Sequence, residues 1–214
     1  MKKITRKIMA AVSAAVMCAV PMASNISANA SVNQSKTYLV IGVAQNPRIA
    51  YFDFAISYNA NVTANPGVAT NLCKNGYFSS SNNTSQRKVL HTYNGAAIGA
   101  KGDLFTTKFV APMNSDSIFD YVSQSDVKIR NTSGTTMSPS SIALDEILMG
   151  DVDMNGVVND DDATLIMQSI ANPDKYHLNA RQRIAGDVYE SGSGLTGMDA
   201  YTIQMYVNGQ MEHF

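Results

Sequence analysis

The residues with the clearest chemistry form an acidic run in the last third of the chain, where oxygen-bearing side chains recur at fixed intervals. Positions 1, 3, 5, 9 and 12 of a twelve-residue segment are Asp151, Asp153, Asn155, Asn159 and Asp162. Calcium takes about six to eight oxygen ligands, and a turning loop with this spacing directs them at one centre. Gly156 stands at the sixth position, where the chain bends sharply, and Val157 would add its backbone carbonyl. The spacing predicts a calcium site, and a solvated turn that only caps a helix explains it less well.

A second copy of the segment follows 36 or 37 residues later, because Gly-Asp-Val at 150–152 recurs at 186–188. The second loop, residues 187–199, is one residue longer and carries Tyr189 in place of Asp153. Its candidate calcium ligands are Asp187, Glu190, Ser191, Ser193 and Asp199. Two interpretations stay open: a second calcium site whose extra residue bulges outward, or a Gly-rich turn held by packing alone.

Each loop is expected to lead into a short helix. After the first loop, apolar side chains recur at helical spacing from residue 161 to about residue 171, and Pro173 cannot continue the helix. A helix pair this small contains too few apolar side chains to fold alone. Calcium would then be part of the free energy of folding, and we expect two bound ions.

The duplicated segment, about residues 149–208, resembles the type I dockerin family, with Gly-Asp-Val at the start of each repeat and Asp-Ala at the end of each loop. The resemblance implies that residues 149–214 form an antiparallel pair of loop-helices that folds around calcium and binds a cohesin domain of a scaffold protein. It also implies which residues contact that partner: Asp160, Asp161, Met167, Gln168, Gly197, Met198, Gln204 and Met205. The alternative for each is ordinary surface, or core for the methionines.

The part of the chain before the loops differs in charge. Residues 31–144 carry nine Lys or Arg and five Asp, whereas residues 145–214 carry twelve acidic and three basic side chains. This step predicts a domain boundary near residue 145. A half as acidic as the second repels nucleic acid and anionic lipid, so neither is an expected partner.

Strand patterns dominate the first half. Short runs of alternating apolar side chains at residues 38–43, 51–58, 104–110 and 127–130 predict strands, separated by turns rich in Asn, Gly, Ser and Pro. We therefore expect a multidomain chain in which an all-β sandwich at residues 31–148 precedes a small all-α domain.

The β-rich half also resembles a known family. Residues 46–58, 75–77 and 102–109, in this order, resemble the cohesin fold, the domain that receives dockerins, and the resemblance spans about residues 37–148. It implies that this half binds a dockerin-bearing protein. The alternative is a carbohydrate-binding module that stacks polysaccharide on aromatic rings. The candidate rings are Tyr51, Tyr77, Phe78 and Tyr93, and core packing explains most of them better.

Catalytic residues are sparse in this half, and we expect no enzyme. Glycoside hydrolysis usually needs two carboxyl groups that flank one bond, but the five aspartates here are scattered and no Glu accompanies them. Cys73 and His91 could form a nucleophile and base, yet no orienting third group or signature accompanies them.

The first thirty residues have the pattern of a secretory signal peptide. Four basic residues lie within residues 1–7, an apolar run follows at 8–23, and small residues precede residue 31. We expect a secreted, non-catalytic adaptor of a cellulosome-type complex. It would dock to a cohesin, receive another dockerin and so support polysaccharide degradation; the alternative is that its dockerin delivers a carbohydrate-binding module.

Overall fold

A computed structural model describes residues 32–214. The predicted signal peptide at residues 1–30 lies outside the described residues. No helix of the described part is long and apolar enough to span a membrane.

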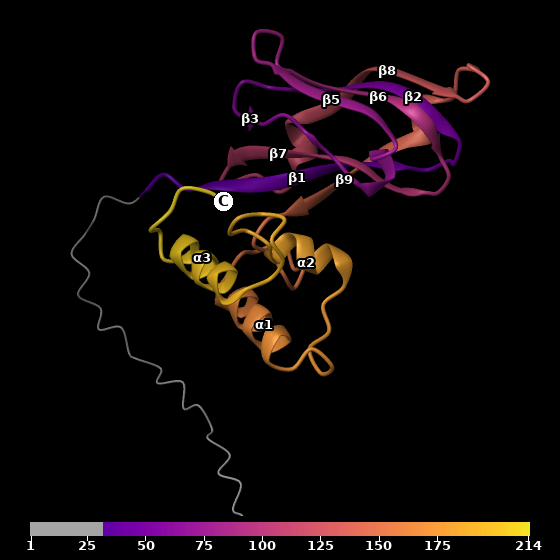
Figure 1. The fold of residues 1–214 in the computed structure, drawn as a ribbon. Helices are drawn as coiled ribbons and strands as arrows, with labels where there is room; N and C mark the ends of the chain where they lie inside the picture. The colour runs from indigo at the N-terminus through magenta and orange to yellow at the C-terminus, as the bar shows by residue number, and fades with distance from the viewer. Residues whose placement is uncertain (1–31) are drawn as a thin grey trace, which may run out of the picture. The chain divides into compact units, whose positions relative to one another are not determined.

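Within residues 32–214, nine strands form two antiparallel sheets that face each other (Figure 1). One sheet has the order β3-β7-β1-β9, with β4 also paired to β7, and the other has the order β5-β6-β2-β8. The strands are β1 (Ser35–Ala44), β2 (Ile49–Tyr58), β3 (Thr63–Ala64), β4 (Val68–Ala69), β5 (Gly76–Asn83), β6 (Lys88–Ile98), β7 (Gly102–Pro112), β8 (Val122–Asn131) and β9 (Ile142–Leu148). Short 3-10 turns lie at Asn71–Cys73, Ile118–Asp120 and Pro139–Ser141. The prediction of an all-β sandwich is confirmed.

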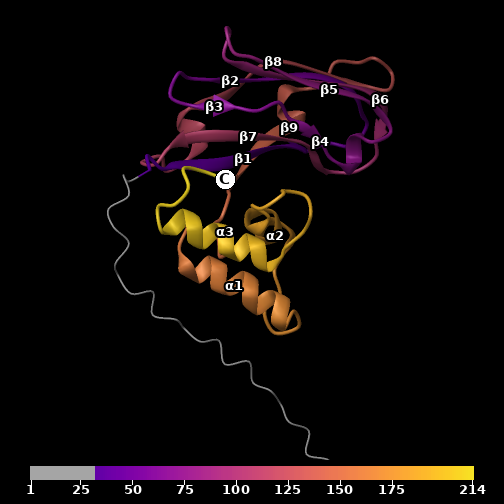
Figure 2. The same cartoon turned by 60° about the vertical axis from the view of Figure 1, so that its left-hand side comes forward.

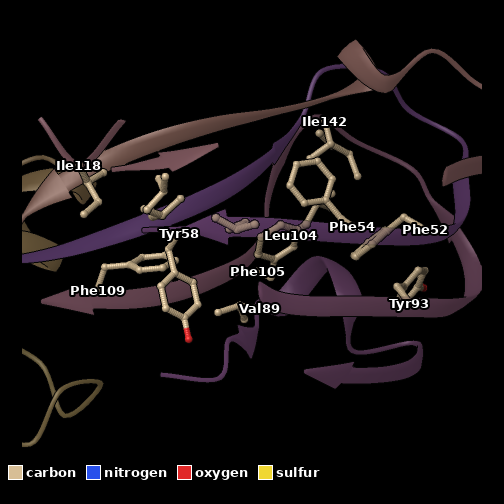
Figure 3. Packing of buried hydrophobic residues seen from close by; sticks show 14 of the residues in the cluster. Phe52, Phe54, Tyr58, Val89, Tyr93, Leu104, Phe105, Phe109, Ile118 and Ile142 are labelled. Carbon is tan, nitrogen blue, oxygen red and sulfur yellow. The ribbon is translucent and has the colours of Figure 1, made fainter. Parts of the chain in front are cut away.

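The space between the sheets is filled by aromatic and branched side chains (Figure 3). Phe52, Phe54 and Ile56 of β2 point into it, as the alternation of that strand predicts. The ring of Phe54 lies 5.5 Å from the ring of Phe105 on β7. A Cβ on Gly42 would lie 2.2 Å from a ring atom of Phe105, so only glycine lets β1 pass this ring.

In the described part of the chain, three α-helices follow the sandwich, and α1 and α3 lie side by side in both views (Figure 1, Figure 2). Their bounds are α1 (Asp160–Ala171), α2 (Ala180–Gly186) and α3 (Gly197–Val207). Helix α1 matches the predicted helix within one residue. Helix α2 was not predicted, because its seven residues give too short a stretch for the helical period to show.

Strand β1 is buried on both faces, which the alternation argument did not anticipate. Tyr38 and Val40 pack into the sandwich core, whereas Ile41 and Ile147 belong to a second core together with residues of the helices, among them Ile166 and Ile203. A near-continuous apolar strand is the pattern expected when both faces are covered. The predicted boundary near residue 145 is thus a change of secondary structure within one packed unit.

The chain ends reinforce this contact. The backbone N–H of Ser35 donates to the carbonyl of Glu212 at 2.8 Å, and Thr37 exchanges side-chain hydrogen bonds with the backbone of Phe214. The Tyr206 hydroxyl donates to the carbonyl of Ser35 at 3.0 Å. The helical segment therefore packs directly on β1, with no linker between the two parts.

Candidate functional site

The last aspartate of the first loop organises that loop. One carboxylate oxygen of Asp162 accepts the backbone N–H groups of Val152 at 2.7 Å and Asp153 at 3.0 Å, and the other accepts that of Asn159 at 2.9 Å. Asp162 is completely buried in the first turn of α1. Its carboxylate joins the start and end of the loop.

Three carboxylates converge inside this loop. Oxygen atoms of Asp151, Asp153 and Asp162 all lie within 4.8 Å of one another. Asp151 is buried and accepts the backbone N–H groups of Asn155 at 3.0 Å and Gly156 at 2.8 Å. This donor set, made only of oxygen atoms around one point, suits a hard divalent cation.

The electrostatics of the loop favour a cation as well. Burial raises the pKa of Asp151, and the charge of Asp162 raises it further, although backbone N–H donors act in the opposite direction. Burial likewise raises the pKa of Asp162, against the effect of its three backbone donors. A positive ion among these oxygens would offset the cost of keeping the carboxylates ionised.

The remaining candidates of the first loop lie on its turn. Gly156 has φ +90°, as its position predicts, and Met154 also takes a positive φ of 64°. The side chain of Asn155 accepts from the backbone N–H of Val157 at 2.8 Å, and Val157 is exposed. Asn159 serves as the N-cap of α1 and accepts the backbone N–H of Asp161 at 2.7 Å.

The second loop repeats this hydrogen-bonding frame. One oxygen of Asp199 accepts the backbone N–H groups of Val188 at 3.0 Å and Tyr189 at 2.8 Å, and the other accepts that of Thr196 at 2.7 Å. Asp199 is completely buried. These contacts match those of Asp162 position for position, so the two loops share one construction despite their different sequences.

The extra residue of the second loop lies after its sixth position. Glu190 and Gly192 have φ +48° and +99°, close to Met154 and Gly156 at the same offsets from the first aspartate. Beyond this point, Gly192 and Thr196 are separated by three residues, whereas the corresponding positions of the first loop are separated by two. The insertion therefore falls at residues 193–195, in a stretch that ends in the partly buried Leu195.

The other ligand candidates of the second loop do not converge as the carboxylates of the first loop do. Asp187 accepts the backbone N–H of Gly192 at 2.9 Å through one oxygen, and its other oxygen is buried without a hydrogen-bond partner. Glu190, Ser191 and Ser193 are exposed, and Glu190 occupies the place that Met154 has in the first loop. Among the described residues, the group of converging carboxylates includes none from this loop.

The predicted partner contacts lie on the two long helices. Most of them are exposed, and Gln168 and Met205 are partly buried. The exposed ones are Asp160, Asp161, Met167, Gly197, Met198 and Gln204. None of these side chains belongs to the helical core.

The candidate dyad of the sandwich is not in a reactive state. Burial raises the pKa of the Cys73 thiol to about 12 and lowers the pKa of His91 to about 3. His91 instead hydrogen-bonds Thr107 Oγ1 through Nε2 at 2.6 Å and packs edge-on against Phe105, with ring centroids 4.0 Å apart. These groups pack as a neutral thiol and a neutral imidazole.

The aromatic candidates of the sandwich divide into core and surface. Tyr93 is completely buried and stacks on Phe52, with centroids 5.6 Å apart. Tyr77 is 68% exposed. Tyr51 lies in a shallow hollow on the outer face of the β2 sheet, under the guanidinium of Arg130 at 5.6 Å.

Two residues with important structural roles were not predicted from the sequence. Arg181 on α2 forms a bidentate ion pair with Asp103, in which its guanidinium nitrogens lie 2.9 and 3.2 Å from the two carboxylate oxygens. One of these nitrogens also lies 3.1 Å from a carboxylate oxygen of Asp145. No local pattern predicts this long-range contact. Thr196 caps α3 and stands three residues before Asp199, a spacing typical of a capping box that could have been recognised.

Comparisons with known proteins locate relatives of parts of this chain. No family model matches it. A curated xylanase/beta-glucanase from Ruminococcus flavefaciens is 44% identical over an alignment of 66 residues, and the match covers 27% of this chain and 8% of that protein. The chain therefore spans a small part of that relative's length.

Two solved structures are also similar to parts of the chain. One is titled as the third ScaB cohesin of R. flavefaciens in complex with a group 1 dockerin; it is 38% identical, covers 29% of this chain and 90% of the other, and has a TM-score of 0.28. The other is a non-cellulosomal cohesin from the hyperthermophilic archaeon Archaeoglobus fulgidus. It is 13% identical, the match covers 50% of this chain and 76% of that chain, and the TM-score is 0.38.

Proposed function

We propose that this protein is a secreted, non-catalytic subunit of a cellulosome-type assembly, and that residues 149–214 act as a dockerin that binds a cohesin. The observation that carries the proposal is the shared frame of the two loops. In each, a buried aspartate at the last position accepts the backbone N–H groups of the second and third positions and of the residue three places before it. Such duplication is the form expected of a paired calcium-loop module.

The first loop would hold its calcium through Asp151, Asp153 and Asp162, with Asn155 beside them. Bound calcium would supply positive charge that balances these carboxylates and ties the loop to α1. The second loop would bind its ion through Asp187 and Asp199. Asp187 has one buried oxygen without a partner there. We expect weaker binding in the second loop, because Tyr189 replaces a carboxylate and one residue is inserted.

The curated relative supports an accessory module in preference to a catalytic domain. A segment of 66 residues that is 44% identical yet takes up only 8% of a xylanase/beta-glucanase is the pattern of a module shared between otherwise different proteins. Modules of this kind serve function through their own sites, whatever the neighbouring domain does. We therefore propose an accessory role for this segment and no hydrolytic activity for the chain.

For the sandwich we propose the role of a receptor for another dockerin-bearing protein, which would make the chain an adaptor. A carbohydrate-binding role is the second candidate, favoured by Tyr77 at 68% exposure and by the hollow that contains Tyr51 and Asn94. Retention of the purified chain on cellulose or xylan would support the second candidate. The receptor role would be supported if the chain still retains a dockerin-bearing protein after its helical segment has been saturated with cohesin.

The docking proposal is tested by calorimetry of the full chain with calcium, followed by titration with a panel of cohesin domains. We expect two bound ions, and cohesin binding that disappears when a chelator is added. Asp151→Ala should abolish binding of the ion in the first loop, and Asp174→Ala, an exposed aspartate outside both loops, is the matched control. A chain that binds no calcium, or that binds cohesin equally well in chelator, would contradict the proposal.

A further inference from the structure

The second loop starts at the end of a helix that is fixed to the sandwich. Near the start of α2, Arg181 pairs with Asp103 of β7 at 2.9 Å. Near its end, the carbonyl of Ala185 accepts the backbone N–H of Gly150 at 2.7 Å. Asp187, the first ligand candidate of the second loop, is the C-cap of this helix. The sandwich therefore determines where Asp187 stands.

The strand register shows which residues of β7 lie under the helices. Asp103 pairs with Val43 of β1, and further along β7 Lys108 pairs with Leu39. Residues that pair directly in neighbouring strands project to the same face of a sheet. Both β1 residues pack against the helical core, so their two β7 partners project to the face that the helices cover. Lys108 is half-buried there.

The end of α2 lies level with Lys108. Leu39 pairs with Lys108 on one side and with Ile147 of β9 on the other, so these three residues form one row across the sheet. Gly150, which hydrogen-bonds the end of α2, follows Ile147 by three residues. Burial lowers the pKa of the Lys108 ammonium and the charge of Asp187 raises it, so the two charges interact across this interface.

The second loop has an unsatisfied need for positive charge. One carboxylate oxygen of Asp187 is buried without a hydrogen-bond partner among the described residues, and a cation would satisfy it. The loop nevertheless attracts calcium less than the first loop does, because residues 187–199 include three acidic side chains and residues 151–162 include five. An ammonium fixed nearby offsets part of the remaining negative charge.

We propose that Lys108 of the sandwich is a built-in counter-ion of the second loop, which stabilises Asp187 in the absence of calcium and lowers the affinity of this loop for calcium. The proposal rests on the calcium sites proposed above. A fixed positive charge attracts the carboxylate while the ion is absent and repels the ion when it arrives. The sandwich would thereby hold the second loop at calcium concentrations too low to fill it, and the first loop would respond to calcium more strongly.

The test titrates the full chain with calcium by calorimetry. Lys108→Met removes the charge but keeps an unbranched apolar stem, and Lys108→Arg keeps the charge. Lys101→Met, at an exposed lysine directly before β7, is the matched control. Asp151→Ala, added to each chain, removes the ion of the first loop, so the remaining binding step belongs to the second loop. Circular dichroism in saturating calcium checks that each variant is folded.

We expect Lys108→Met to bind calcium in the second loop about 3- to 10-fold more tightly than the wild type, and the gain should shrink as salt screens the charge. Lys108→Arg and Lys101→Met should stay within about two-fold of the wild type. In chelator, the helical segment of Lys108→Met should unfold at a lower urea concentration than that of the wild type. In saturating calcium this difference should vanish or reverse.

A purely structural role of Lys108 would give a different result, because lost packing lowers stability equally with and without calcium. That result overturns the proposal. So does an unchanged or lower affinity of Lys108→Met when the wild type binds two ions, and the docking function then still stands. If neither the wild type nor Lys108→Met binds calcium in the second loop, the calcium site proposed for that loop fails together with this proposal.

Discussion

The sandwich and the helical segment are stabilised by different kinds of buried group. The completely buried aromatic side chains all lie in the sandwich, and the helical segment has none. They are Phe52, Phe54, Tyr93, Phe105 and Phe109. The buried polar groups of the sandwich are hydroxyls and the imidazole of His91. The helical segment buries few large side chains, but its buried polar groups include the carboxylates of Asp151, Asp162 and Asp199.

This difference indicates which interactions stabilise each part. Each apolar side chain buried in the sandwich contributes about 1.5 to 3 kcal/mol through removal from water, independently of pH or metal. Buried carboxylates stabilise a loop only while their hydrogen bonds and charges are satisfied. We therefore expect the helical segment to respond to calcium and to changes at single aspartates, and the sandwich to respond to changes in its core.

The largest effect should follow from Asp162→Ala. This change removes the acceptor of three backbone N–H groups in a buried position, so we expect the free energy of unfolding of the helical segment to fall by about 3 kcal/mol or more. Denaturation at fixed calcium, followed by helical circular dichroism, measures the change. Asp174→Ala should differ from wild type by less than about 0.5 kcal/mol. Equal stability of the Asp162 variant would remove the contrast between the two parts.

A smaller effect, confined to the sandwich, should follow acidification. Burial lowers the pKa of His91 in the folded state to about 3, below its value of about 6.5 in an unfolded chain. The stability contributed by the neutral imidazole is thus complete above pH 6.5 and is lost as the pH falls toward 3. Between pH 7 and pH 5 the loss should be about 2 kcal/mol.

The control for this pH effect is His91→Gln, which keeps a polar group beside Thr107 but cannot titrate. Sandwich stability, followed by denaturation in saturating calcium, should depend less on pH in this variant than in the wild type. The other two histidines are exposed, so the difference between the two profiles isolates His91. Parallel profiles would show that the imidazole is not held neutral by the core.

The smallest effect concerns the contact between the two parts. Arg181→Gln removes the ion pairs of α2 with Asp103 and Asp145, and we expect a loss of about 1 kcal/mol that shrinks at high salt. A double-mutant cycle with Asp103→Asn measures the coupling. Lys88→Gln, which breaks an ion pair within the sandwich, should leave the coupling of the two parts unchanged. A cycle without interaction energy would mean that this ion pair adds nothing to the apolar packing and the hydrogen bonds that join the two parts.

Local features of this protein were predictable from its sequence. The alternation in β2 placed Phe52 and Phe54 in the core, and the oxygen spacing after Asp151 located the loop whose carboxylates converge. Helix α1 began and ended close to the predicted residues because its capping residue and Pro173 act within one turn. In each case the determining contacts join residues close in the chain, so the pattern of residue types contains them.

Other features were decided only by tertiary structure. The sequence did not show that Ile41 and Ile147 face a second core, that Arg181 pairs with Asp103, or that the inserted residue lies after Gly192. The pattern of residue types predicted strands β1, β2, β7 and β8 and the two loops with their carboxylates, since these depend on local periodicity and spacing, whereas it did not predict β5 and β6. Which strand faces which helix depended on contacts between residues far apart in the chain, whose free energy appears only when both sides are folded and in place.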